Sequence, residues 1–108
     1  MNLQVSPQQL AVKLKSLNPP RLLDVRQPEE HAIVALPGAV LIPLNELSMR
    51  LDELADWKTE EIVVYCHHGI RSLNAISQLR NYGFANLLNL AGGIDRWSQE
   101  VDPRAPRY

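Results

Sequence analysis

The chain has 108 residues, a formal net charge of −1, 45% hydrophobic residues and 21% charged residues. This length and balance fit one domain with one hydrophobic core and exclude a disordered or collagen-like chain. The near-neutral charge argues against a nucleic-acid or membrane-surface partner, since such partners usually require a strongly basic surface.

The start of the chain lacks the charged residues and apolar stretch of a secretory signal, and no apolar run approaches membrane-spanning length. We therefore expect a soluble, cytoplasmic protein. The one cysteine, Cys66, excludes an internal disulfide and a cluster of thiolate metal ligands. Cys66 is either a small buried hydrophobe or the reactive group of the protein.

The first predicted helix starts at Ser6, which can cap it, with Pro7 suited to the first helical position and Gln9 able to complete a capping box. An apolar face at helical spacing follows: Leu10, Leu14 and Leu17. The prolines at positions 19 and 20 end the pattern, and we expect this helix to cover a sheet.

Residues 21–26 predict a short buried strand that ends in charges, followed by a turn. Asp24 and Arg26 lie where this strand leaves the core. They form either a solvated ion pair or a support for a site, and the pattern leaves both interpretations open.

Residues 31–36 are ambiguous, and residues 39–43 predict another short strand in the interior of the sheet. Residues 44–55 predict a second covering helix, with apolar positions at Leu44, Leu47, Leu51 and Leu54.

Residues 61–65 predict the central buried strand, and residues 66–71 form the loop that follows it. A helix is expected over residues 73–82, ended by Gly83, with a buried stripe of Ala75, Ile76, Leu79 and Tyr82. Residues 87–91 predict the last strand, and a short helix runs from the paired glycines 92 and 93 through Trp97. Strands that alternate with helices predict an α/β fold with parallel strands and helices on both faces.

The carboxyl ends of parallel strands share one edge, where such sheets bind ligands, and Cys66 lies there. A helix amino terminus, the loop N–H groups and the permanent cation of Arg71 all favour a thiolate at Cys66. His67 and His68 add charge when protonated. Adjacent histidines in a loop rarely converge on one ion, so we expect no metal site.

Four motifs occur together along the chain. They are Leu22-Leu23-Asp24-Val25-Arg26 with Glu29-Glu30; Pro37-Gly38-Ala39 leading to Ile42-Pro43; Cys66-His67-His68-Gly69-Ile70-Arg71-Ser72; and Gly92-Gly93-Ile94 with Trp97. In combination they resemble the rhodanese domain over about residues 4–100, and the tail, residues 101–108, resembles that of short bacterial single-domain sulfurtransferases. One departure is visible, because residues 34–36 replace the Gly-His-Ile that often precedes Pro-Gly-Ala in the family.

The resemblance implies a single domain over residues 1–108, with a mainly parallel sheet of about five strands and helices on both faces. It implies a thiosulfate sulfurtransferase without a cofactor. Cys66 would take sulfane sulfur from a donor such as thiosulfate and pass it to cyanide in vitro or to a thiol in the cell. The persulfide would lie in the ring of N–H groups from His67 to Ser72, which includes Gly69, Ile70 and Arg71.

The resemblance also implies supporting roles. Gly69 would permit the tight turn, and Arg71 would fix the loop and favour anions, with Asp24 as its candidate acidic partner. His67 and His68 would attract an anionic donor. The partners would be a small sulfur donor and a thiol acceptor, or a sulfur-relay protein, with no nucleic acid or membrane.

Two alternatives remain at this point. A non-catalytic binding module can use the same fold, although it has no need of a reactive cysteine. A cysteine phosphatase or arsenate reductase also places a loop between a cysteine and an arginine, but that loop has five intervening residues. Here four residues separate Cys66 from Arg71, a shorter ring that suits one sulfur atom better than a phosphate.

Overall fold

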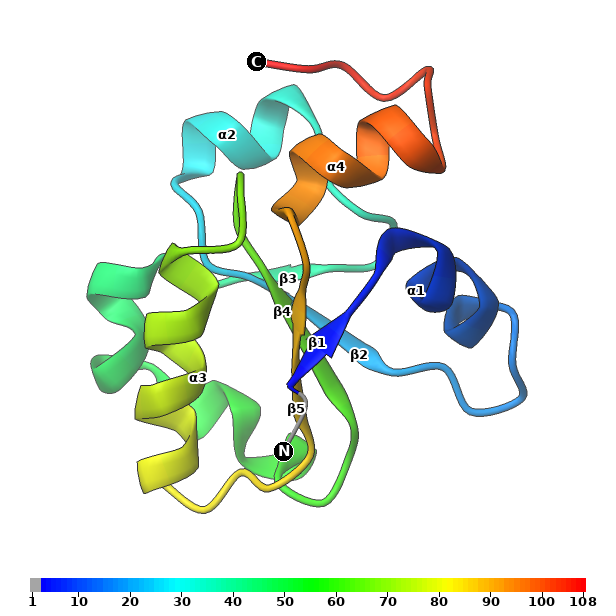
Figure 1. The fold of residues 1–108 in the computed structure, drawn as a ribbon. Helices are drawn as coiled ribbons and strands as arrows, with labels where there is room; N and C mark the ends of the chain where they lie inside the picture. The colour runs from blue at the N-terminus through cyan, green and yellow to red at the C-terminus, as the bar shows by residue number, and fades with distance from the viewer. Residues whose placement is uncertain (1–2) are drawn as a thin grey trace.

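The structure is a computed structural model, which describes residues 3–108. Within these residues, a five-stranded sheet has the order β1-β5-β4-β2-β3, and all its strand pairs are parallel (Figure 1). The strands are β1 (Gln4–Val5), β2 (Arg21–Asp24), β3 (Val40–Leu41), β4 (Ile62–Tyr65) and β5 (Leu87–Leu90). The helices are α1 (Pro7–Leu14), α2 (Pro28–Ile33), α3 (Arg71–Asn81) and α4 (Gly93–Glu100), with the 3-10 helices η1 (Leu44–Met49) and η2 (Leu51–Trp57).

Helices cover both faces of the sheet, which confirms the predicted α/β class. Side chains of successive strand residues point to opposite faces, so neighbours such as Val63 and Val64 enter different cores. Val64 packs with residues of α3, η1 and η2, whereas Val63 packs with residues of α1 and α4. β4 occupies the centre of the sheet, as predicted, and all of its residues are buried because it is covered on both sides.

The start of α1 matches the sequence prediction, but its end does not. Ser6 and Gln9 form the expected capping box. The helix ends at Leu14, so the prediction that Leu17 belongs to its buried face was wrong, and Leu17 is 99% exposed. The Ser16 hydroxyl donates to the Lys13 carbonyl at 2.6 Å. This hydrogen bond gives a carbonyl of the last turn a local partner, so the helix ends before the prolines at positions 19 and 20.

The predicted second covering helix is divided into η1 and η2, which meet at Arg50. In a 3-10 helix, side chains three residues apart lie in line. Leu44 and Leu47 have this spacing, as do Leu51 and Leu54, and the second member of each pair is fully buried. Leu47 and Leu51 lie four positions apart, and the boundary between η1 and η2 falls in this interval. The apolar spacing that predicted one α-helix therefore belongs to two short 3-10 helices.

Two further predictions were wrong, and one strand was missed. The strand expected in the interior of the sheet, β3, lies at its edge, beside β2 alone. β1 was missed because two residues are too short to show a period, and Val5 pairs with Leu90 of β5. Tyr82 was placed in the buried stripe of α3, yet it lies at the end of that helix and is 51% exposed. Gly83 has a φ of +93°, as expected for a residue that ends a helix.

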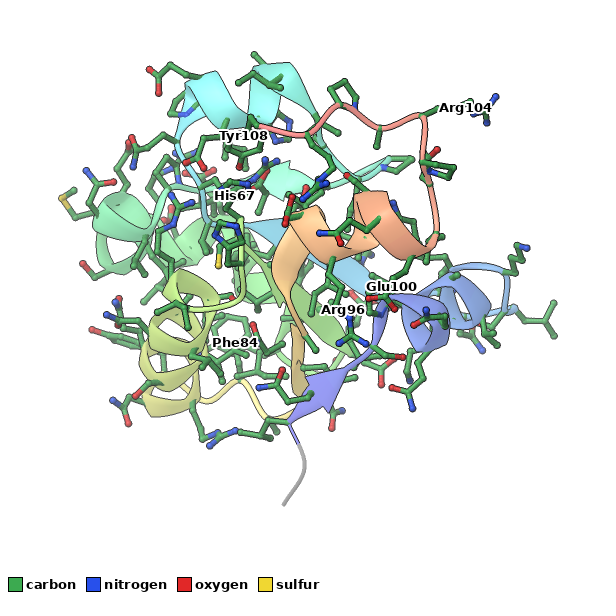
Figure 2. All side chains as sticks on the ribbon, turned by 45° about the horizontal axis from the view of Figure 1, so that its top comes forward. His67, Phe84, Arg96, Glu100, Arg104 and Tyr108 are labelled. Carbon is green, nitrogen blue, oxygen red and sulfur yellow. The ribbon has the colours of Figure 1, made fainter. Side chains whose placement is uncertain are left out.

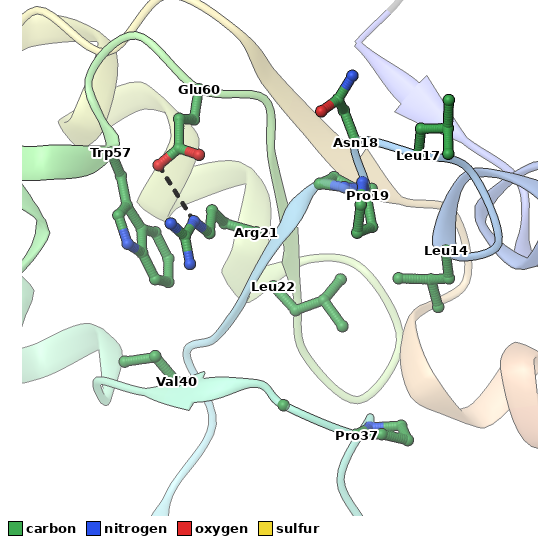
Figure 3. Close-up of a pocket in the computed structure, with 12 residues that line it drawn as sticks. Leu14, Leu17, Asn18, Pro19, Arg21, Leu22, Pro37, Val40, Trp57 and Glu60 are labelled. Atoms are coloured by element: carbon green, nitrogen blue, oxygen red, sulfur yellow. Dashed lines mark hydrogen bonds and ion pairs between the residues drawn. The ribbon is translucent and has the colours of Figure 1, made fainter.

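A hollow of about 690 Å³ lies at the amino ends of β2 and β3 (Figure 3). Its wall includes Trp57 and the ion pair between Arg21 and Glu60, whose Nε and Oε2 atoms are 3.1 Å apart. Cys66 lies at the opposite ends of the strands, so this hollow is separate from the loop that follows Cys66. Within residues 3–108, none of the helices has the length and apolar character needed to cross a bilayer.

The corrected end of α1 makes a testable prediction. Leu10 is fully buried against the sheet, so Leu10→Ala should reduce the free energy of unfolding by about 2–5 kcal/mol. Leu17→Ala should change it by less than about 0.5 kcal/mol, because that side chain buries no surface. Urea unfolding of both variants measures the difference, and an equal loss in the two would contradict the helix boundary.

Candidate active site

Cys66 follows β4 directly and is only 1% exposed. Its Sγ accepts hydrogen bonds from the backbone N–H groups of Gly69 at 3.1 Å and Ser72 at 3.4 Å. The Ser72 hydroxyl lies 3.4 Å from the same sulfur. The loop therefore curls around Sγ and directs N–H groups at it, an arrangement that stabilises negative charge on sulfur.

The sulfur also takes the place of a capping side chain on α3. The first N–H groups of a helix have no intrahelical partner and carry a partial positive charge. The N-cap residue, Ile70, provides no side-chain hydrogen bond, and the N–H of Ser72 in the first turn donates to Sγ instead. The amino end of α3 therefore adds to the field that favours a thiolate or a persulfide at Cys66.

A second helix holds the other side of the loop. At the start of α4, the N–H of Ile94 donates to the Cys66 carbonyl at 2.9 Å, and the N–H of Asp95 donates to the His67 carbonyl at 3.1 Å. Gly93 makes this approach possible, because a Cβ atom there would collide with the His67 carbonyl and lie 2.6 Å from the Cys66 oxygen. The carbonyls of Cys66 and His67 are thus bound by α4, while the N–H group of Gly69 faces the sulfur.

A buried polar network fixes the turn of the loop. Gly69 has a φ of +98°, in the left-handed region that favours glycine. Its carbonyl accepts from the Asn89 Nδ2 at 3.2 Å, and the Asn89 Oδ1 accepts a short hydrogen bond from the Ser72 hydroxyl. Asn89 lies in β5 and is 2% exposed. One side chain of the neighbouring strand therefore holds both ends of the sulfur-binding turn.

The acidic partner of Arg71 is Glu30, and the expectation that Asp24 would bind it was wrong. The two guanidinium nitrogens Nη1 and Nη2 donate to Oε1 and Oε2 of Glu30 at 2.7 and 2.8 Å. The Arg71 hydrogen bonds are the main cause that lowers the pKa of Glu30 to about 2, and the same pairing raises the pKa of Arg71. Arg71 is therefore anchored to α2, beside the loop.

Asp24 pairs instead with Arg26, and both side chains are fully buried, so the interpretation as a solvated pair was wrong. Arg26 donates from Nε to Oδ1 at 2.9 Å and from Nη2 to Oδ2 at 2.7 Å. Its remaining donors reach the carbonyls of Glu30 at 3.3 Å and Val34 at 2.6 Å. Burial opposes the charge, but the hydrogen bonds to Asp24 and Tyr108 outweigh it and raise the pKa of Arg26. The pair anchors α2.

The two histidines have different surroundings. His67 stacks on Tyr108, with ring centroids 3.9 Å apart and planes inclined by 9° (Figure 2). Burial, and then repulsion from His68, lowers the pKa of His67, so near neutral pH it carries little of the charge expected to attract a donor. His68 is exposed, and its Nε2 lies 3.8 Å from Asp95.

The ligand atoms of His67, His68 and Asp95 lie within 4.8 Å of one another, contrary to the argument that adjacent histidines would not converge. However, both carboxylate oxygens of Asp95 already accept from Arg107, at 2.9 and 3.3 Å. A cation there would have to displace this neutralising partner, and we retain the expectation that the site uses no metal.

The tail, residues 101–108, turns back over α4 and ends near α2 (Figure 1), and Tyr108 lies beside His67 of the loop (Figure 2). Arg107 binds Asp95 of α4, and the Tyr108 hydroxyl donates to Oε2 of Glu30 at 2.7 Å. The sequence left the order of this segment open, because a tail is ordered only where it finds such contacts.

Comparisons with known proteins agree with this geometry. A family model described as "Rhodanese-like domain" matches residues 6–100. The chain belongs to the rhodanese-like domain family. The resemblance proposed from the motifs is therefore confirmed.

Three similar proteins show the range of the family. A protein of Allochromatium vinosum named "Sulfurtransferase" is 31% identical over 93% of this chain and 92% of its own length. The "Adenylyltransferase and sulfurtransferase uba4" of Ogataea parapolymorpha is 38% identical over 89% of this chain, which spans 24% of that protein. The structure of the human single-domain sulfurtransferase TSTD1 has a TM-score of 0.78 and 32% identity, and the match covers 93% of this chain and 98% of that one.

Sequence reasoning gave no role to four residues of this rhodanese-like site: Glu30, Asn89, Gly93 and Tyr108. Glu30 and Gly93 lie in the motifs that carried the resemblance, and Asn89 interrupts an otherwise apolar strand, where a buried polar side chain needs a partner. The partners of Glu30 and Tyr108 lie 41 and 78 residues away, and no local pattern encodes such contacts.

The approach of α4 to the loop predicts the effect of a single methyl group. Gly93→Ala should cost about 1–3 kcal/mol more in unfolding free energy than Gly83→Ala. It should also slow the alkylation of Cys66, because the loop that carries this residue must shift. Gly83 is the matched control, since it also has a positive φ but nothing lies within 4 Å of a Cβ built there. Equal losses in the two variants would show that backbone strain alone, without the collision, determines the cost.

The Glu30–Arg71 pair predicts a dependence on acid. The pKa of Glu30 is about 2 in the folded protein, and its ordinary value is 4.5. The contribution of the pair to the unfolding free energy is therefore complete above pH 4.5 and is lost as the pH falls toward 2. Glu30→Gln should therefore reduce the unfolding free energy by on the order of 2 kcal/mol near neutral pH and by much less near pH 2. Glu29→Gln, at an exposed position of the same helix, should show no such trend in urea unfolding.

Proposed function

We propose that this rhodanese-like domain is a sulfurtransferase that carries sulfane sulfur as a persulfide on Cys66. The observation that supports it most directly is the position of Sγ at the amino end of α3, where the N–H groups of Gly69 and Ser72 donate to it. This arrangement stabilises an anionic sulfur without a metal or a cofactor. The names of the two full-length relatives, a sulfurtransferase and a single-domain sulfurtransferase, agree with the proposal.

In the first half-reaction, the thiolate of Cys66 attacks the outer sulfur of a donor such as thiosulfate. The S–S bond of the donor breaks, sulfite leaves with the bonding electron pair, and the outer sulfur stays on Cys66 as a persulfide. The incoming sulfur would extend from Sγ into the turn closed by Gly69 and Ser72. Because Arg71 lies beside this turn, its charge favours an anionic donor.

In the second half-reaction, a nucleophile attacks the outer sulfur of the persulfide, and Cys66 leaves as the thiolate. Cyanide can serve in vitro, and a thiol is the acceptor we propose in the cell. The chain has no second cysteine, so the persulfide cannot collapse to an internal disulfide and must be discharged by an outside acceptor.

The acceptor can be a small thiol or a protein in a sulfur relay. The relative named for both adenylyltransferase and sulfurtransferase activity joins such a domain to a longer protein, which favours a protein partner in at least that case. We propose the cytoplasm as the compartment, since a reactive free thiol suits a reducing environment. The four-residue spacing between Cys66 and Arg71 favours sulfur transfer over phosphate chemistry.

Intact-mass measurement tests the persulfide directly. Incubation with thiosulfate should add one sulfur atom to the wild-type chain, and cyanide should remove it. Cys66→Ser should gain nothing, although its unfolding free energy should change by less than about 1 kcal/mol, since the hydroxyl is nearly isosteric and keeps the two N–H partners. Absence of the added mass in the wild type, with a small persulfide as donor as well, would refute the proposal and leave a binding module.

The role of Arg71 is tested by its removal. Arg71→Ala should lower kcat/KM for thiosulfate by about tenfold to a hundredfold, because the donor loses a nearby cation and α2 loses its tie to the loop. Arg80→Ala is the matched control on the same helix, at an exposed position far along α3, and should keep wild-type kinetics. A loss of the same size in both variants would point to general damage to α3.

A further inference from the structure

Tyr108 joins the two ion pairs beside the loop. Its hydroxyl donates to Oε2 of Glu30 at 2.7 Å and accepts from Nη1 of Arg26 at 2.8 Å. Glu30 holds Arg71, and Arg26 holds the buried carboxylate of Asp24. One hydroxyl of the tail therefore connects a fully buried ion pair to the pair that anchors the loop arginine.

The ring of Tyr108 makes a separate contact with the loop. It lies parallel to the ring of His67, the residue directly after Cys66, and Figure 2 shows the two rings side by side. His67 Nε2 is buried and makes no hydrogen bond to any described residue. The backbone of His67 is held by α4, but the orientation of its side chain depends on contacts with the rings of His68 and Tyr108, and the Tyr108 ring is the more nearly parallel of the two.

The helix that carries Glu30 needs such support. α2 has six residues and none of its side chains is fully buried, so apolar packing contributes little to its position. Polar contacts hold it, namely those of Arg26 with the Glu30 and Val34 carbonyls, of His31 with Asp24, of Arg71 with Glu30, and of Tyr108 with Glu30. A hydrogen bond to a charged group is stronger than a neutral one, so the Tyr108 hydroxyl is a substantial part of this support.

We propose that Tyr108 is a positioning residue of the sulfur-transfer site, and that it acts through Glu30 on Arg71. The hydroxyl fixes Glu30, Glu30 fixes the guanidinium beside the loop, and the ring orients the side chain of His67, the residue after Cys66. The inference rests on the proposed function and extends it. In this proposal, a contact between the tail and the body of the domain positions the arginine that meets an anionic donor.

Steady-state transfer from thiosulfate to cyanide tests the kinetic consequence. Tyr108→Phe keeps the ring and removes the hydroxyl, and it should raise KM for thiosulfate about threefold to tenfold with kcat nearly unchanged. The reason is that a donor anion meets Arg71 in the ground state and in the transition state alike. Tyr82→Phe, which removes a hydroxyl from the exposed tyrosine that follows α3, is the control and should retain the wild-type KM. A wild-type KM in Tyr108→Phe would overturn the proposal.

A second measurement does not depend on sulfur transfer. Iodoacetate and iodoacetamide both alkylate Cys66, but only iodoacetate is an anion, so the ratio of their rates reports the cation near the sulfur. Tyr108→Phe should lower this ratio by about the same factor as it raises KM, and Arg71→Ala should lower it further. If the wild type transfers no sulfur and the ratio still falls, the proposed function fails while the positioning role stands. An unchanged ratio overturns the positioning role.

A double-mutant cycle shows whether Tyr108 acts through Glu30. In a Glu30→Ala background, Tyr108→Phe should change the alkylation ratio by less than about 1.5-fold, because the group it positions is gone. Glu30→Gln serves the same purpose if the alanine variant does not fold. Additive effects of Tyr108→Phe and the Glu30 substitution would show that the tyrosine acts by another path and would overturn the inference.

Discussion

Two helix amino termini determine the orientation of the peptide groups around Cys66. The first turn of α3 directs an N–H group at the sulfur, and the first turn of α4 binds the carbonyl oxygens of Cys66 and His67. With these carbonyls engaged on the far side, the N–H group of Gly69 is left to face Sγ. The parallel sheet makes this possible, because it brings the carboxyl ends of β4 and β5, and hence the starts of both helices, to the same edge.

The side-chain charges around the loop are largely neutralised by one another. Arg26 binds Asp24, Arg71 binds Glu30, and Arg107 binds Asp95. Fixed backbone dipoles therefore provide much of the field at the sulfur, and the arginines shape its surroundings. Such a site suits a single negative charge held at one place better than a multiply charged phosphate.

The ion pairs also connect distant parts of the chain. The Asp24–Arg26 pair belongs to the end of β2, Glu30 to α2, Arg71 to the start of α3 and Tyr108 to the tail. Since α2 buries no side chain completely, these polar contacts, rather than a hydrophobic core, keep it beside the loop. The tail is thereby part of the site, although it contributes no strand or helix to the fold.

The sequence by itself determined the features that depend on local chemistry. The alternation of strands and helices, the capping box at Ser6, the glycine end of α3 and the place of Cys66 at the end of the central strand all follow from periodicity and turn preferences. The tertiary structure decided which distant groups meet: β1 beside β5, Glu30 rather than Asp24 on Arg71, and Tyr108 on His67. Local sequence patterns do not predict such contacts. An arginine, for example, can pair with any carboxylate that the fold brings within reach.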